Sequence, residues 1–131
     1  MNKHRRMPFV LPFVAAVVIL LAAGWLMRLP AQAAPLSTYY VAPGGDDGNS
    51  CLAVGAPCAT IGAAVDKATN GDTIMIAAGT YFESDIEISE DLTLTGDGAA
   101  TTIVDGGGNG RVFTIYGETT LSHLTIQNGQ T

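Results

Sequence analysis

Basic residues are scarce in this chain. It holds six lysines and arginines against twelve aspartates and glutamates, and four of the six basic residues lie within the first 28 positions. After residue 33 the chain has two basic residues, Lys67 and Arg111, and all twelve acidic ones. Residues 34–131 therefore carry a formal charge of −10. Such a surface repels phosphate backbones and anionic lipids, so we expect no nucleic-acid partner. It also disfavours a polyanionic substrate such as pectate, unless cations bridge the two.

Cysteine is limited to Cys51 and Cys58. A zinc site would need two further ligands close by, and the one histidine after residue 33, His123, is far along the chain. If this part of the chain is exported, a short disulfide loop is the natural interpretation, and two free thiols are the alternative.

Long apolar runs are also absent, with one exception near the N-terminus. Three basic residues among the first six precede an apolar run over residues 9–27, and Ala31-Gln32-Ala33 then fits the small-residue site of a signal peptidase. We predict a signal peptide over residues 1–33, cut between Ala33 and Ala34. An uncleaved anchor is the alternative, because the run is just long enough to cross a hydrocarbon core of roughly 30 Å. Both interpretations place the rest of the chain outside the cell, secreted or at the cell surface, and membrane contact is expected only through this segment.

Residues 34–59 are predicted to form a first strand followed by the disulfide loop. The strand is indicated by the β-prone run Ser37–Val41, and the loop by a succession of glycine, aspartate and asparagine after Pro43. Oxygen atoms of Asp46, Asp47 and Asn49 could hold calcium, but the spacing lacks the pattern of an EF-hand. A solvated turn is therefore predicted, and no cofactor is expected apart from this calcium hypothesis.

Residues 60–131 are predicted to form a short helix and then a series of strands. Apolar residues recur at helical spacing over about ten positions, with Thr60 as N-cap and Asn70-Gly71 as the stop; the apolar face would be Ile61, Ala64, Val65 and Ala68. The neighbouring Asp66 and Lys67 fit a solvated face.

After Gly71 the period changes to two, and short apolar pairs alternate with glycine- and asparagine-rich turns. Leu92–Gly96 resembles the segment that begins at Leu124, which indicates an imperfect repeat. This repeat and the close spacing of the strands favour a solenoid over a β-sandwich, whose strands are usually longer.

Several strings together resemble the N-terminus of right-handed parallel β-helix proteins of the pectin-lyase-like superfamily, over about residues 38–129. They are Tyr39–Pro43 with the loop behind it, Pro57–Ile61, Ala64, Ala68, Gly71–Ile74 and Gly79–Tyr81. The resemblance implies an all-β solenoid whose open N-terminal end is capped by the helix. With coils of roughly 20 to 30 residues, about three would form, and we expect a solenoid truncated at Thr131.

Gly79-Thr80-Tyr81-Phe82-Glu83 also fits the G-x-Y-x-E pattern of pectinesterases. The segments that carry the two catalytic aspartates and the arginine of that family have no counterpart here, and we predict a structural role for Tyr81. The same reasoning assigns no catalytic residue elsewhere. Asp85 and Glu87 are predicted on the outer face of a strand, where they could hold a cation but more simply form a solvated face with Glu90 and Asp91. His123 is predicted as an outward strand residue.

These observations favour an exported, non-catalytic module of an adhesin-like or surface structural protein that binds a polysaccharide or a neighbouring surface protein. The alternative is the N-terminal part of a pectate-lyase-like or pectinesterase-like enzyme, whose catalytic coils would lie beyond residue 131.

Overall fold

The computed structural model describes residues 32–131, in which Pro35–Thr131 form one compact unit. Residues 1–31, with most of the predicted signal peptide and the apolar run, lie outside the described residues. At the predicted cleavage site, Ala33 and Ala34 are exposed and belong to no helix or strand. The cleavage itself therefore stays a prediction.

Short strands dominate the described residues, with one helix among them. The helix is α2 (Ile61–Lys67), and the strands are β1 (Thr38–Val41), β2 (Thr73–Ile76), β3 (Gly79–Phe82), β4 (Ile86–Ile88), β5 (Leu92–Gly96), β6 (Thr102–Asp105), β7 (Phe113–Ile115), β8 (Thr119–Ser122) and β9 (Thr125–Gln127).

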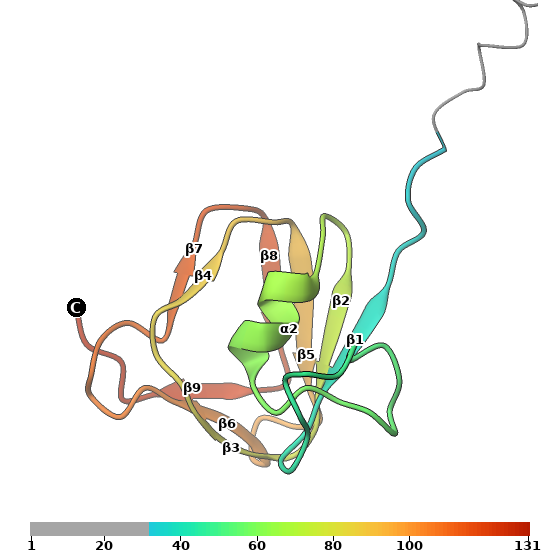
Figure 1. Ribbon diagram of the computed structural model, residues 1–131. Coiled ribbons are helices and arrows are strands. Elements are labelled where there is room, and N and C mark those ends of the chain that lie inside the picture. Colours follow the sequence, from blue (N-terminus) through green and yellow to red (C-terminus); the bar gives the residue numbers. More distant parts are fainter. Residues whose placement is uncertain (1–31) are drawn as a thin grey trace, which may run out of the picture. The chain divides into compact units, whose positions relative to one another are not determined.

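The strands form three parallel sheets around a common interior (Figure 1). One sheet has the order β1-β2-β5-β8, the second β3-β6-β9 and the third β4-β7. Each strand from β1 to β6 pairs in parallel with the strand that follows one circuit later, as in a solenoid. The predicted all-β, parallel, solenoid-like arrangement with one short helix is confirmed, and residues 32–131 do not form a sandwich of antiparallel sheets.

The register contradicts the repeat that the sequence indicates between Leu92–Gly96 and the segment after Leu124. Ile74 pairs with Leu94 and Leu94 with Leu121, so that successive circuits differ in length and the second is the longer. The segment after Leu124 belongs to β9, which pairs with β6 in a different sheet from Leu92–Gly96. The two segments look alike because both are short alternating strands that end in a turn, rather than because they stack on each other.

The core consists of inward residues that repeat from coil to coil. Ile74 and Leu94 stack in register and are fully buried, and Ile88 and Val104 occupy the same kind of position in the other two sheets. Each fully buried aliphatic side chain of this kind stabilises the fold by about 1.5–3 kcal/mol. The period-two alternation predicted for these strands follows from this inward-outward placement.

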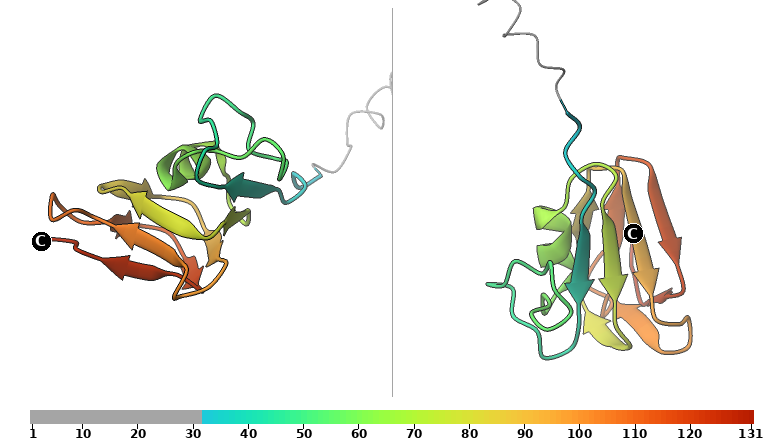
Figure 2. Two further views of the ribbon diagram at one scale, coloured as in Figure 1. Left: turned by 90° about the horizontal axis from the view of Figure 1, so that it is seen from below. Right: turned by 90° about the vertical axis from the view of Figure 1, so that its right-hand side faces the viewer.

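Helix α2 lies across the interior at the end of the stack where β1 is found, away from the C-terminus (Figures 1 and 2). Thr60 is the N-cap, as predicted: its hydroxyl accepts a hydrogen bond of 3.2 Å from the Ala63 N–H. The predicted length of about ten residues is wrong, because the helix ends at Lys67. The backbone of Ala68 is already extended, and the Asp72 carboxylate accepts a hydrogen bond of 2.8 Å from the Thr69 N–H. The helix therefore ends before Asn70.

One buried hydroxyl lacks a partner in the described residues. The Oγ1 atom of Thr119 lies at an inward position of β8, in register with the buried Leu92, and makes no hydrogen bond there. A buried polar atom in this state costs the folded protein about 1–3 kcal/mol.

Replacing Thr119 by valine, which has nearly the same shape, is therefore expected to raise the free energy of unfolding by about 1 kcal/mol. Urea denaturation measures the change. The matched control is Thr120→Val, because Thr120 is the exposed neighbour on the same strand, and it should shift stability by less than about 0.5 kcal/mol. An unchanged or lower stability in the Thr119 variant would contradict the assignment.

Candidate ligand-binding groove

The predicted disulfide between Cys51 and Cys58 is present, and both residues are fully buried. It closes a loop that pairs with the outer edge of β1: the Tyr40 N–H donates to the Cys51 carbonyl at 2.7 Å, and the Cys58 N–H donates to the Tyr40 carbonyl at 2.8 Å. Such a bond persists in an oxidising compartment. The loop is therefore fixed at one margin of the four-stranded sheet.

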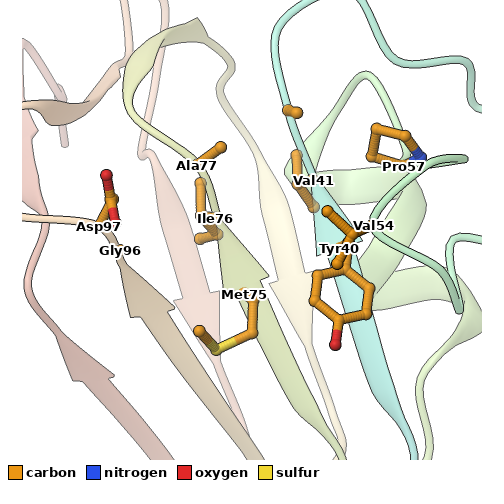
Figure 3. Close-up of a pocket in the computed structure, with 10 residues that line it drawn as sticks. Tyr40, Val41, Val54, Pro57, Met75, Ile76, Ala77, Gly96 and Asp97 are labelled. Carbon is orange, nitrogen blue, oxygen red and sulfur yellow. The ribbon is translucent and has the colours of Figure 1, made fainter.

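A groove of about 260 Å³ lies between this loop and the outer face of the sheet. Figure 3 shows Tyr40 of β1 between Met75 of β2 and the loop that carries Val54 and Pro57. Val54 and Met75 are exposed, and Asp97, just after β5, adds an exposed carboxylate to the lining. The groove thus combines an aromatic and apolar wall with one charged acceptor.

Two rows of outward side chains run across the strands beside the groove. One row consists of hydroxyl groups alone: Thr38, Thr73, Thr93 and Thr120 are paired in register from β1 to β8. The second row contains Tyr40, Met75, Thr95 and Ser122, and the hydroxyls of Thr95 and Ser122 lie 3.2 Å apart. Neighbouring parallel strands lie about 4.8 Å apart, so that the rows offer donors and acceptors at regular intervals.

Sequence reasoning did not identify this groove. It placed Tyr40 in the first strand, and period-two alternation could have marked the ring as outward. The folding of the loop onto that ring depends on backbone pairing to β1, for which the sequence pattern carries no signal.

The polar loop residues that were considered as calcium ligands form hydrogen bonds with backbone groups of the loop and of the start of α2. The Asp46 carboxylate accepts from the Gly48 N–H at 2.8 Å, and the Asn49 amide donates to the Pro57 carbonyl at 2.9 Å. The Asp47 carboxylate accepts from the N–H groups of Ala59 and Thr60 and from the Thr60 hydroxyl. Among residues 32–131, no three His, Cys, Asp or Glu side chains are grouped so that they could hold a metal ion.

The G-x-Y-x-E residues are occupied in structural contacts. Gly79 packs so closely on Pro43 that a Cβ atom there would lie 2.5 Å from the proline ring. The buried Tyr81 donates its hydroxyl to the Ala77 carbonyl at 2.8 Å, and burial, with the charge of Glu83, raises the pKa of Tyr81 to about 12. The Glu83 carboxylate accepts from the N–H groups of Ile61 and Gly62 at 2.8 and 2.9 Å, at the first turn of α2.

Three further predictions are wrong in part. Asp85 precedes β4 in a left-handed conformation (φ 58°), and Glu87 alone is on the outer face of the strand. His123 follows β8 in a turn with φ 54°, exposed as predicted but outside the strand. Of the pair on α2, Asp66 is solvated, whereas Lys67 is partly buried and donates its Nζ to the Asp47 carbonyl at 2.8 Å.

Other acidic side chains hold one coil to the next. At the corner before the four-stranded sheet, Asp72 accepts from the Ser37 N–H of the preceding coil at 2.7 Å, and Asp91 accepts from the Glu118 N–H of the following coil at 2.7 Å. At the corner after β6, Asp105 accepts from the side chains of Gln127 and Asn128. Each of these contacts joins residues far apart in the chain.

These hydrogen bonds favour the ionised carboxylate. For Asp72, burial opposes ionisation, but the donors Ser37 and Thr69 outweigh it and lower the pKa below its usual value. For Asp105, the hydrogen bond from Gln127, with those from Gly107 and Asn128, lowers the pKa against a smaller effect of burial.

No helix within residues 32–131 is long and apolar enough to cross a membrane. Comparisons of the chain with protein-family models, with curated proteins and with solved structures find no match in any of the three.

The lowered pKa values predict acid sensitivity. A carboxyl group whose pKa is depressed in the fold contributes stability above its unfolded-state pKa near 4, and this stability is lost as the pH falls through the folded value. Asp72→Asn should therefore lower the free energy of unfolding at pH 7 by about 1 kcal/mol and flatten the loss of stability below pH 4. Urea denaturation from pH 7 to pH 2.5 measures both effects.

Asp66→Asn is the control, since Asp66 is exposed and its carboxylate makes no hydrogen bond with the described residues. A control variant that loses as much stability as the Asp72 variant would show that the coil-to-coil contact is not responsible.

Proposed function

We propose that this chain is an exported, non-catalytic module of an adhesin-like or surface structural protein, built as a right-handed parallel β-helix, which binds an uncharged glycan in the groove beside Tyr40. The observation that carries the proposal is the groove itself, in which an aromatic ring and apolar side chains stand next to rows of hydroxyl groups and one exposed carboxylate. Sugars present apolar C–H faces and hydroxyl groups together, so that this combination suits them.

The β-helix assignment rests on the three parallel sheets, on the return of the chain to each sheet once per circuit and on the helix across one end. A solenoid end exposes apolar side chains and unpaired backbone groups, and α2 with the disulfide loop meets that need. The pectin-lyase-like resemblance fits the same residues and stays part of the proposal.

Export is supported by the disulfide and by the N-terminal sequence. The Cys51–Cys58 bond favours an oxidising compartment. The basic start, the apolar run and the Ala31–Ala33 triplet are typical of a signal peptide that is cut before Ala34.

The charge of the exported part restricts the ligand. Residues 34–131 carry two basic side chains and twelve acidic ones, and Asp97 stands in the groove itself. A uronate polymer would be repelled at this site. A neutral polysaccharide is therefore the proposed ligand class.

No specific observation favours the alternative that the chain is part of an enzyme. Tyr81 and Glu83, the residues of the pectinesterase-like string, make structural contacts. Among the described residues, Asp47 of the loop and the acids at the corners, Asp72, Asp91 and Asp105, likewise accept hydrogen bonds from backbone or amide donors.

The test is binding to a neutral xylan or β-glucan by the protein recovered from an export-competent host, with polygalacturonate as the charged comparison. We expect binding to the neutral polymers and a loss of about tenfold or more in affinity for Tyr40→Ala, which corresponds to about 1.4 kcal/mol. Tyr40→Phe keeps the ring and should retain most of the affinity. The mass of the recovered protein reports whether it begins at Ala34.

Tyr116→Ala is the matched control, because Tyr116 is an exposed tyrosine remote from the groove lining. Equal losses in the two alanine variants, or stronger binding to polygalacturonate than to neutral polymers, would overturn the assigned groove and ligand class.

A further inference from the structure

The groove beside Tyr40 is apolar except at one side. Ten residues line it, and Asp97 is the charged one among them. Figure 3 shows Tyr40 and Asp97 on opposite sides of the groove, with Met75 and Ala77 between them. This order follows from the sheet, because β2 lies between β1 and β5, and Asp97 directly follows β5. Met75 and Ala77 are exposed, so a ligand in the groove contacts an apolar floor between an aromatic ring and a carboxylate.

The carboxylate of Asp97 is free to bind a ligand. It makes no hydrogen bond within residues 32–131, whereas the backbone N–H of the same residue donates to the Thr102 hydroxyl at 3.0 Å. In this respect it differs from Asp47, Asp72 and Asp105, whose carboxylates already accept from donors of the protein. An ionised carboxylate only accepts hydrogen bonds. The ligand group opposite Asp97 therefore has to be a donor.

The apolar floor restricts which donor fits. A sugar that carries hydroxyl groups alone would place some of them against Met75 and Ala77, where they lose hydrogen bonds to water and find no partner. An acetamido group in place of one hydroxyl offers a methyl group to the floor and an N–H to Asp97. In a planar trans amide, the methyl group and the N–H lie on the same side of the C–N bond. Both can therefore reach neighbouring parts of the groove at once.

The dimensions of the groove suit one sugar unit with this substituent. Tyr40 and Asp97 lie two strands apart, which corresponds to about 10 Å at a strand spacing of about 4.8 Å. The volume of about 260 Å³ is that of a small site. A single sugar ring can thus stack on Tyr40 while its acetamido group lies over Met75 and reaches Asp97. Further sugars of the chain would extend beyond the groove.

We propose that the groove recognises an N-acetylhexosamine unit of a neutral polysaccharide, with Asp97 as the acceptor for the acetamido N–H. Met75 and Ala77 contact the methyl group. The proposal rests on the glycan-binding function proposed above and specifies the sugar. A free amino sugar would also be attracted by the carboxylate, but its ammonium group would lie against the apolar floor, where a charge is poorly solvated.

The test is calorimetric titration of the full chain, recovered from an export-competent host, with two tetrasaccharides that share one backbone linkage, N-acetylated chitotetraose and cellotetraose. We expect the acetylated ligand to bind about tenfold or more tightly. Asp97→Ala should remove most of this preference and change the affinity for cellotetraose by less than about threefold. The matched control is Asp66→Ala, because Asp66 is an exposed acid on α2 outside the groove lining.

A second measurement uses the unaltered chain. In saturation-transfer NMR, the acetamido methyl protons should receive more saturation than the ring protons of the same ligand, and the reverse order would contradict the assigned contact. Equal affinity for the two tetrasaccharides, tighter binding of the fully deacetylated tetramer, or an equal loss in the Asp66 variant would overturn the acetamido assignment and leave the glycan groove standing. If neither tetrasaccharide nor any neutral polymer binds, both proposals fail.

Discussion

Every feature of this fold depends on the return of the chain to the same register after each circuit. Parallel pairing lets Ile74 stack on Leu94 and Leu94 on Leu121 only if the corners between the sheets keep their positions from coil to coil. Carboxylates hold these corners: Asp72, Asp91 and Asp105 each accept a hydrogen bond from a donor of a neighbouring coil. An ionised carboxylate accepts several hydrogen bonds at once and binds more strongly than a neutral acceptor. The stack therefore combines an aliphatic interior with anionic corners.

This arrangement gives the acidic composition a structural reason. From the sequence alone, the acids form a solvated surface or a set of potential ligands. In the structure, Asp47 and Glu83 fix the loop and the helix that close the N-terminal end, and the acids at the corners join the coils. The side chains that remain available to a ligand lie on the outer face of the four-stranded sheet, where one row of threonines and a second row that begins at Tyr40 are paired in register.

Local patterns predicted the local structure well. The helix at Ile61, its N-cap Thr60, the disulfide and the alternating strands each depend on neighbouring residues, so the sequence contains their signals. The register could not be read in this way. The circuits differ in length because the turns after β5 and β6 are longer than those after β2 and β3. The sequence therefore has no fixed period from which the register could be predicted. The groove and the corner contacts also escaped prediction, since they join residues far apart in the chain, such as Ser37 with Asp72.

The register between β5 and the last strands is thus the most direct test of the account. In the structure Thr93 pairs with Thr120, whereas the repeat seen in the sequence would place Thr93 beside Thr125. Paired Cα atoms lie about 4.8 Å apart, within the range that a disulfide spans. The double variant Thr93→Cys with Thr120→Cys should form a second disulfide under mild oxidation, as peptide mapping would show, and Thr93→Cys with Thr125→Cys should not. A bond in the second pair and none in the first would contradict the parallel stack described for this protein.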